Sequence, residues 1–272
     1  MRVAELRVYP IKSCAGVSLP RLACKPYGIL HDREFMVVDS EGNFLTERTH
    51  PRMCLVKTEL LKDELCVGTD DLPRDSWIRL PLGDSWGAPR SVRIFDDQCE
   101  ARQVENPEVN EFFSDFLGVP CELVRTDPTR IRRRDSKSTG FKMSLSFQDG
   151  WPILVASVAS LADLNSRLKE PITMTRFRPN IVVEDCEPYA EDDENFLLTI
   201  GDVMLRFGKL CDRCNIPLVD PETGLRGKEP LAALSKYRRG LIQGSNKVFF
   251  GANYLVAKSG YVSVGDEVEV KN

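Results

Sequence analysis

Long apolar runs, an excess of basic charge and a leader sequence are all lacking in this chain. No stretch approaches the roughly 18 consecutive apolar residues that a membrane-spanning helix requires. The net charge of -4 lacks the basic footprint of a general nucleic-acid binder. The N-terminus shows neither the apolar core of a signal peptide nor the Arg- and Ser-rich composition of a transit peptide. We therefore expect a cytoplasmic protein with no membrane span and no nucleic-acid partner.

Disulfide-framework spacing is also lacking, although the chain contains 9 cysteines. An odd number of scattered thiols fits a reducing compartment better than a secreted disulfide scaffold. A hydrophobic content of 42% and a charged content of 29% are typical of an ordinary globular protein. At 272 residues, the chain is long enough for one large domain or two medium ones.

Short apolar or alternating segments between Gly, Asp and Pro residues dominate the sequence and predict strands. The predicted strands are 5–9, 34–38, 44–46, 53–60, 65–67, 77–80, 92–95, 153–155, 181–183, 197–200, 203–207, 249–251 and 254–256, followed by a hairpin over 262–270. Helices are predicted over Pro107–Leu117, after a cap at Ser157, and from Pro230 onward. We therefore expect a mainly β protein with a few helices (α+β) and a domain boundary near residue 120.

A basic run over residues 125–137 contains Arg130, Arg132, Arg133 and Arg134. The first expectation for such a run is a solvated loop. The alternative is a rim that steers an acidic partner toward the protein.

Two thiols, Cys211 and Cys214, stand in a Cys-x-x-Cys pattern with Arg213 between them. This pattern is typical of half a zinc site, of a redox dithiol, or of one soft metal ligand beside a bystander. A closed zinc site needs four ligands. The other cysteines are scattered singly and the only histidines are His31 and His50, so such a site would need long-range convergence.

A thioredoxin-like dithiol stands at the start of a helix, and Pro217 shortly after Cys214 disfavours a helix there. The pattern therefore favours one thiolate that binds a soft metal, with Arg213 supplying positive charge beside it. Either thiol could be the ligand. A metal-free redox pair of Cys211 and Cys214 stays the alternative.

Seven short motifs occur along the chain, and their order carries more information than any one of them. They are Tyr9-Pro10-Ile11-Lys12-Ser13, His31-Asp32-Arg33, Ser160–Asn165, Phe177-Arg178-Pro179-Asn180, Cys211-Asp212-Arg213-Cys214 with Val219–Gly224, Phe250-Gly251 and Val264-Gly265-Asp266. In this order the chain resembles the MOSC-domain proteins of the amidoxime-reducing component type, from about residue 3 to about residue 270. The resemblance implies two β-barrel-like domains, a MOSC N-terminal β-barrel domain over 1–120 and a MOSC domain over 121–272, with a cofactor site between them.

The resemblance further implies a molybdenum–molybdopterin cofactor (Moco) and the reduction of N-hydroxylated compounds such as amidoximes, hydroxylamines and N-hydroxylated bases. The substrate oxygen would pass to molybdenum in a two-electron step that cleaves the N–O bond. Cys214 would be the metal ligand. Arg213 or another nearby cation would stabilise the developing oxyanion. The implied cofactor-binding positions are Lys12, Ser13, Arg33, Asp149, Gly150, Arg178, Asn180, Asp212, Arg213 and Asn253.

Some bacterial relatives carry a C-terminal iron–sulfur domain, whereas this sequence ends at Asn272. We therefore expect electrons from a separate donor, of the cytochrome b5 type or a ferredoxin or flavoprotein reductase. Vertebrate relatives carry an N-terminal mitochondrial anchor, and Met1 stands only just before the first matched strand, which argues against such an anchor here. The alternative function is a Moco-binding or sulfur-carrier module without reductase turnover.

Overall fold

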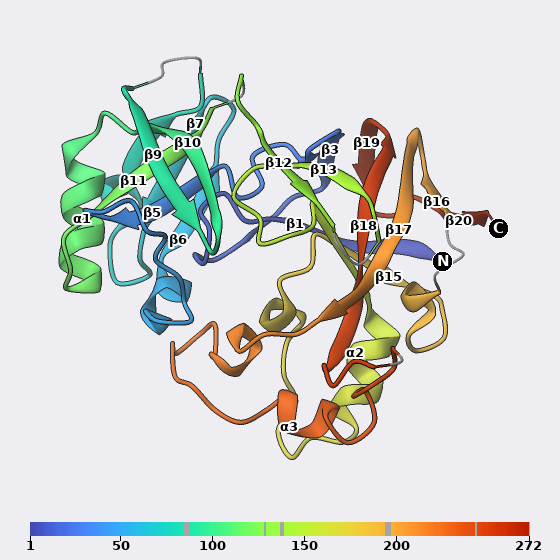
Figure 1. Cartoon of the computed structure of the whole chain (residues 1–272). Helices are drawn as coiled ribbons and strands as arrows, with labels where there is room; N and C mark the ends of the chain where they lie inside the picture. The colour runs from blue at the N-terminus through green and yellow to red at the C-terminus, as the bar shows by residue number, and fades with distance from the viewer. Residues whose placement is uncertain (84–86, 128, 137–138, 194–196, 243, 272) are drawn as a thin grey trace.

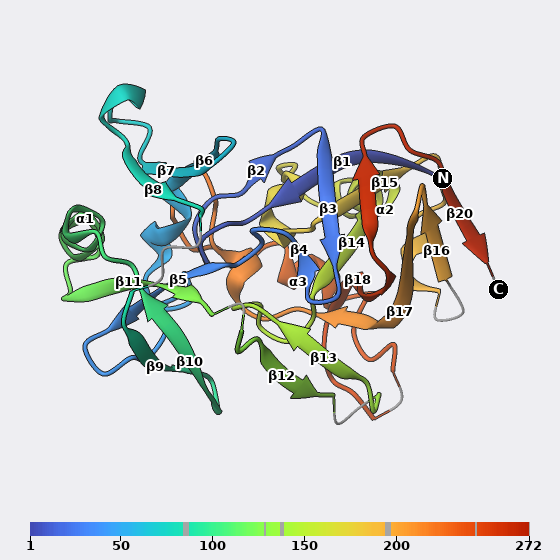
Figure 2. The same cartoon turned by 90° about the horizontal axis from the view of Figure 1, so that it is seen from above.

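The chain folds into two β-rich lobes joined side by side (Figure 1). The computed structural model describes residues 1–83, 87–127, 129–136, 139–193, 197–242 and 244–271. Both termini lie at the outer side of the same lobe, which also holds the longest strands (Figures 1 and 2). The expectation of a mainly β protein with a few helices and two barrel-like domains is confirmed.

A strongly curved eight-stranded sheet forms the first of these lobes. Its spatial order is β2-β1-β15-β14-β18-β17-β16-β20. The strands are β1 (Arg2–Val8), β2 (Val17–Ser18), β14 (Ile153–Ser157), β15 (Ile181–Glu184), β16 (Leu197–Ile200), β17 (Val203–Asp212), β18 (Phe249–Lys258) and β20 (Val268–Lys271). A small sheet of β3 (Arg21–Lys25), β4 (Gly28–Ile29) and β19 (Gly260–Ser263) packs its apolar side chains into the same core.

The second lobe is built from two smaller antiparallel sheets and one helix. Its strands are β5 (Phe35–Asp39), β6 (Lys57–Leu60), β7 (Glu64–Gly68), β8 (Ile78–Pro81), β9 (Pro89–Ile94), β10 (Asp97–Gln103) and β11 (Cys121–Thr126), in the orders β5-β11-β10-β9 and β6-β7-β8. Helix α1 (Pro107–Leu117) begins where the Asn106 side chain accepts a hydrogen bond from Val109 N, and it ends at Gly118 in the left-handed region. The core-facing side chains of α1, including Val109 and Phe113, pack against the strands of this lobe.

The remaining elements are short. Hairpin strands β12 (Arg132–Asp135) and β13 (Lys142–Leu145) pair with each other between the lobes, as Figures 1 and 2 show. Helices α2 (Val158–Asn165) and α3 (Leu231–Leu234) share an apolar cluster beneath β14 and β18. The 3-10 turns are η1 (Pro51–Leu55), η2 (Arg74–Ser76), η3 (Met174–Phe177), η4 (Ala190–Asp192) and η5 (Ile216–Leu218).

The two lobes do not divide cleanly along the sequence. Strand β1, at the very start of the chain, pairs antiparallel with β15 in the eight-stranded sheet. Strand β11, which lies beyond residue 120, pairs with β5 and β10 in the other lobe. The chain therefore crosses the junction directly after β1, which places the segment 9–13 between the lobes. The domain boundary near residue 120 stays a prediction.

Four local expectations are wrong. Segment 44–46 is irregular, joined to β5 only by an isolated bridge at Phe44, and segment 53–60 begins as the turn η1 before β6. The segment 262–270 is not a hairpin, because β19 pairs with β3 whereas β20 pairs with β16. The basic run is not a solvated loop either. It contains β12, in which Arg132 is buried and donates to Asp97 and to the backbone oxygen of Gln148.

Candidate functional site

A cavity of about 790 Å³ opens at the junction of the two lobes. Every site residue that the sequence analysis singled out lines this cavity. They are Lys12, Ser13, Arg33, Asp149, Gly150, Arg178, Asn180, Asp212, Arg213, Cys214 and Asn253. The structure therefore brings together residues from six separate segments of the chain.

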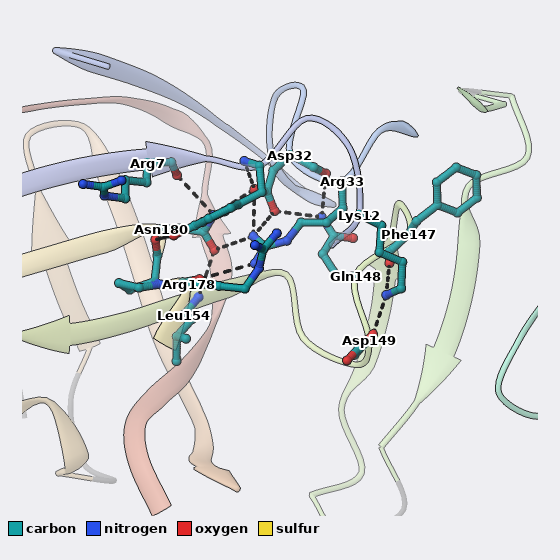
Figure 3. Close-up of polar contacts among 12 residues, drawn as sticks. Arg7, Lys12, Asp32, Arg33, Phe147, Gln148, Asp149, Leu154, Arg178 and Asn180 are labelled. Atoms are coloured by element: carbon teal, nitrogen blue, oxygen red, sulfur yellow. Dashed lines mark hydrogen bonds and ion pairs between the residues drawn. The ribbon is translucent and has the colours of Figure 1, made fainter. Parts of the chain in front are cut away.

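Asp32 is the centre of the polar network below this cavity, although the sequence analysis assigned it no role (Figure 3). Its carboxylate is completely buried and accepts hydrogen bonds from Arg33 Nη1 at 2.7 Å, Asn180 Nδ2 at 3.0 Å and the backbone N–H of Tyr9 at 3.0 Å. A buried charge is tolerated when it is paired and hydrogen-bonded in this way. Asp32 therefore fixes the relative positions of the segments that carry Arg33 and Asn180.

Asn180 ties three strands together at the same point. Its Nδ2 donates to the backbone oxygen of Arg7 at 3.3 Å, and its Oδ1 accepts from the backbone N–H of Leu154 at 3.2 Å (Figure 3). Its backbone N–H also donates to the oxygen of Leu154 at 2.8 Å. The side chain is 2% exposed, so the contacts that the structure shows for Asn180 are those of a positioning residue beneath the cavity.

Three cavity residues hold backbone angles that side-chain-bearing residues rarely adopt. The φ values are 71° at Ser13, 48° at Arg33 and 57° at Arg178. Such left-handed conformations cost of order 1–3 kcal/mol each when the residue is not glycine, and they gather at functional sites. At Arg33 the backbone N–H compensates by donating to the oxygen of Tyr9 at 2.7 Å. The three strained residues therefore mark this face of the cavity as a candidate functional site.

Two guanidinium groups lie against one buried ring. Arg33 and Arg178 each place their guanidinium carbon 4.3 Å from the centroid of the Tyr9 ring. The Tyr9 hydroxyl donates to the backbone oxygen of Pro179 at 3.2 Å, and burial raises the pKa of Tyr9 even though both arginines oppose the shift. The ring therefore supports both cations through its π face, in addition to the hydrogen bonds that they make.

Lys12, Asp149, Arg48 and Cys214 form a continuous chain of contacts along the cavity wall. Lys12 Nζ donates to Asp149 and to the backbone oxygen of Phe147, the latter at 2.7 Å (Figure 3). Arg48 Nη2 donates to the other oxygen of Asp149 and to Cys214 Sγ, at 3.4 Å from the sulfur. The positive Lys12, the negative Asp149 and the positive Arg48 therefore follow one another along the wall, and Arg48 contacts the sulfur of Cys214.

The charges in this chain shift one another. Burial lowers the pKa of Lys12 to about 8, with Asp149 opposing the shift. Burial would raise the pKa of Asp149, but Lys12 and Arg48 outweigh it and lower that pKa. Burial likewise works against the charge of Arg48, yet Asp149 and Cys214 raise its pKa overall. The cluster is thus held in its ionised form near Asp149.

The two thiols of the Cys-x-x-Cys pattern have different arginine partners. Arg213 Nη1 donates to Cys211 Sγ at 3.0 Å, and Arg213 Nη2 donates to the backbone oxygen of Phe177 at 2.9 Å. Cys214 is exposed and contacts Arg48 instead. The positive charge of Arg213 was expected beside the metal ligand, and in the structure it lies at Cys211. Arg48 provides the positive charge at Cys214.

Several arginine N–H groups at the cavity are buried without a hydrogen-bond partner among the described residues. They are Arg48 Nη1, Arg178 Nη2 and Arg213 Nε. Buried donors left unsatisfied are costly, and native proteins rarely keep them. Three such donors, carried by segments far apart in sequence, line the same cavity. Their convergence suits an anionic ligand with several acceptor oxygens.

Sequence reasoning missed Arg48 and its neighbour Glu47, which also line the cavity. Neither stands in one of the recognised motifs, and the polar segment from Thr46 to Thr49 has no periodicity that distinguishes it from a surface loop. Within the described ranges, no group of three or more His, Cys, Asp or Glu residues is arranged to hold a metal ion. In that part of the chain, Cys211 and Cys214 thus have no second ligand pair beside them.

Comparison with known proteins gives two domain matches. The MOSC N-terminal beta barrel domain matches residues 1–120, and the MOSC domain matches residues 142–269. The chain is 35% identical to mitochondrial amidoxime-reducing component 1 of Homo sapiens, over 98% of this chain and 82% of that protein. It is 36% identical to mitochondrial amidoxime reducing component 2 of Rattus norvegicus, with the same two shares.

Solved structures add little to these similarities. The match to the YUAD protein from Bacillus subtilis covers 99% of this chain and 94% of that protein, at 12% identity and with a TM-score of 0.44. The match to YiiM from Geobacillus stearothermophilus covers 52% of this chain and 71% of that protein, at 12% identity and with a TM-score of 0.33. None of the helices in the described part of the chain has the length and apolar character to cross a membrane.

Proposed function

Because this chain belongs to the MOSC-domain family of amidoxime-reducing components, we propose that its cavity binds Moco and reduces N-hydroxylated compounds. The observation that carries the proposal is the convergence of unsatisfied arginine donors on one cavity. Membership of the family suggests an oxidoreductase. The residues that line the cavity are those that we propose carry out the chemistry. The substrates proposed are amidoximes, hydroxylamines and N-hydroxylated bases.

The residues present fit the cofactor. A molybdopterin carries a phosphate, and arginine forks at Arg48, Arg178 and Arg213 offer the N–H donors that phosphate oxygens require. The buried Oε1 of Gln148 has no donor among the described residues and lines the same cavity. It can accept a hydrogen bond from an N–H group of a pterin ring. Lys12, Ser13, Arg33, Asp149, Gly150, Asp212 and Asn253 complete the proposed binding set.

Cys214 is the proposed metal ligand. Molybdenum prefers soft sulfur donors, and the thiolate is the form that binds a metal. Arg48, 3.4 Å from the sulfur, stabilises negative charge there. Cys211 is half-buried, and its sulfur already accepts a hydrogen bond of 3.0 Å from Arg213 Nη1. This difference between the two thiols supports Cys214 as the ligand and Cys211 as a neighbour.

The chemistry needs electrons, protons and stabilised charge. When bound, the reduced cofactor supplies the two electrons that break the N–O bond. The oxygen leaves as water, and each turnover consumes two protons, one that completes the water and one that the nitrogen gains. Arg213 and Arg48 are the cations that stand by the thiols, and preorganised positive charge of this kind stabilises an oxygen that becomes negative as the bond breaks. Electrons would reach the site from a separate donor protein, of cytochrome b5 type or a ferredoxin or flavoprotein reductase. The cytoplasmic location stays a prediction.

The test uses protein made in a host that synthesises Moco. Molybdenum and pterin are measured per chain, and benzamidoxime is then offered to enzyme reduced with dithionite. The proposal predicts near-stoichiometric cofactor and formation of benzamidine. Cofactor without benzamidine would support the carrier alternative, and no molybdenum in the wild type would overturn both. Equal loss of activity in Cys211→Ser and Cys214→Ser, without molybdenum, would favour the redox dithiol.

A further inference from the structure

Glu47 is the one buried acidic side chain among the described residues that line the cavity, and no cation among those residues donates a hydrogen bond to it. It lines the cavity together with Arg48 and Cys214, yet it is only 3% exposed. Its Oε1 is buried and accepts no hydrogen bond within the described ranges. The nearest cation is Arg178, whose Nε lies 3.6 Å from that oxygen. Asp149, by contrast, is engaged by both Lys12 and Arg48.

The charges around Glu47 act in opposite directions. Burial raises its pKa above the ordinary value, Arg178, Arg48 and Arg33 lower it, and Asp149 raises it; the balance is a raised pKa. The thiols Cys14 and Cys54 also lie near this carboxyl, and burial raises the pKa of both, that of Cys54 to about 11. Those thiols are therefore neutral neighbours, and they add no negative charge at neutral pH.

An anionic cofactor would raise the pKa of Glu47 further. The arginines that favour the carboxylate form of Glu47 include Arg48 and Arg178, whose free N–H groups line the cavity. Phosphate oxygens bound there would offset part of their positive charge. The neutral carboxylic acid, which can donate a proton, then becomes the preferred form. Buried carboxyl groups with raised pKa values act as general acids in this manner.

Other ionisable groups of the wall are less suited to this task. Lys12 is bound by Phe147 O and Asp149 through its ammonium group, so its protons are already engaged. The pKa of Asp149 is lowered by Lys12 and Arg48 against the effect of burial, and that of Asp212 is lowered chiefly by Lys209, again against burial. Both carboxyl groups are thus ionised and have no proton to donate.

We propose that Glu47 donates one of the two protons consumed in each turnover, the one that turns the departing hydroxyl group into water. The inference rests on the proposed function and adds a named residue to it. The balanced reaction converts R–C(=NOH)–NH2, two electrons and two protons into R–C(=NH)–NH2 and water. The N–O bond breaks, the nitrogen is reduced, and the electrons come from the reduced cofactor. Glu47 is left as a carboxylate and regains its proton from solvent before the next turnover.

A merely structural role would be to hold Arg178 in its left-handed conformation, since that side chain is the nearest cation. Glu47→Gln distinguishes the two roles because it keeps the size and polarity of the side chain but cannot release a proton. Glu47→Asp keeps the acid but shortens it. Asp135→Asn is the matched control, because Asp135 is an exposed carboxyl that lines the same cavity.

The experiment compares these holoenzymes in three measurements. Molybdenum and pterin content tests binding, and infrared difference spectra over pH test for a protonated carboxyl that the Gln variant lacks. Single-turnover reduction of benzamidoxime by pre-reduced enzyme, over pH, tests proton delivery. We expect unchanged cofactor content and a rate at least about 10²-fold lower in Glu47→Gln, the lower end of the usual contribution of a general acid. The wild-type rate should fall as the pH rises through the raised pKa of Glu47, and Glu47→Gln should lose that dependence.

Each outcome bears on the inference. Loss of molybdenum in Glu47→Gln would overturn it in favour of the role in positioning Arg178. A wild-type rate and an unchanged pH profile in that variant would overturn it as well, as would the absence of a titrating carboxyl from the infrared spectra. Wild-type holoenzyme that never forms benzamidine would overturn the proposed function itself. In that case the infrared spectra still report separately whether Glu47 holds a proton.

Discussion

Arg48 Nη2 lies 3.4 Å from Cys214 Sγ, although 166 positions separate the two residues in sequence. The same nitrogen donates to Asp149, and the backbone oxygen of Arg48 accepts a hydrogen bond of 2.6 Å from Arg226 Nη2. Arg48 therefore joins the segment between β5 and η1, in the second lobe, to both the thiol and the Lys12–Asp149 pair.

Replacing Arg48 should weaken the site without unfolding the protein. Arg48→Gln removes the cation beside Cys214, and groups that support a metal ligand typically contribute about 10–100-fold to metal affinity or activity. We expect a loss of this size in benzamidoxime reduction, together with lower molybdenum retention on dialysis. Arg52→Gln is the control, because Arg52 is exposed and stacks on Phe116 at 4.5 Å. Equal retention in the two variants would contradict the role given to Arg48.

Asp32→Asn should be strongly destabilising. The substitution puts an NH2 group among donors that now point at carboxylate oxygens, and it removes the charge whose two oxygens both accept from Arg33 Nη1. Breaking a buried ion pair typically costs about 3–5 kcal/mol. The free energy of unfolding from urea titration measures the effect.

The matched control for Asp32 is Glu64→Gln. Glu64 pairs with Arg79 at 3.0 Å on the surface, with side-chain exposures of 41% and 57%. Exposed pairs contribute about 0–1 kcal/mol. Similar losses in the two variants would show that the buried network does not hold the site together.

Acid should remove the contribution of Asp149 to stability. Its pKa is lower in the folded chain because Lys12 and Arg48 outweigh burial. The stabilisation is therefore complete above the ordinary pKa of about 3.9 and is lost as the pH falls through the lower folded value. Urea midpoints measured from pH 6 downward should fall more steeply for the wild type than for Asp149→Asn. Parallel curves, with Asp135→Asn as the control, would contradict this account.

Gly16→Ala should disturb the ring that supports two cavity arginines. A Cβ at Gly16 would lie 2.5 Å from Cε1 of Tyr9, and the buried ring is held between its neighbours. Overpacking of this kind typically costs about 1–3 kcal/mol. At Gly227 a Cβ would meet no heavy atom within 4 Å of those described, so Gly227→Ala should leave the melting temperature unchanged. Equal melting temperatures in both variants would count against the tight packing of Tyr9.

The sequence predicts local structure well where the pattern is local. Helix α1 has its amphipathic face, its cap and its terminal glycine within one stretch, and the residues Pro107–Leu117 were predicted with the observed bounds. The residues 262–270 fail for the opposite reason. Their strands join partners far away in sequence, and strand pairing of that kind leaves no local signal.

The cavity was predicted through ordered motifs rather than through spacing. Lys12, Arg33, Arg178 and Cys214 belong to motifs and converge as expected. Arg48 and Glu47 carry no motif, and only the fold reveals that they lie at the cavity. Arg132 was placed in a solvated loop because a basic run has no apolar period. Its burial depends on Asp97 and the backbone of Gln148, which the sequence around it does not show.

X-ray absorption at the molybdenum edge tests the central claim most directly, since it counts the sulfur atoms bound to the metal. The measurement compares wild type, Cys214→Ser and Cys211→Ser, all made in a host that synthesises Moco. The account predicts molybdenum in the wild type, one sulfur ligand fewer in Cys214→Ser, and the wild-type number in Cys211→Ser. Equal sulfur numbers in wild type and Cys214→Ser, or a wild type without molybdenum, would contradict it.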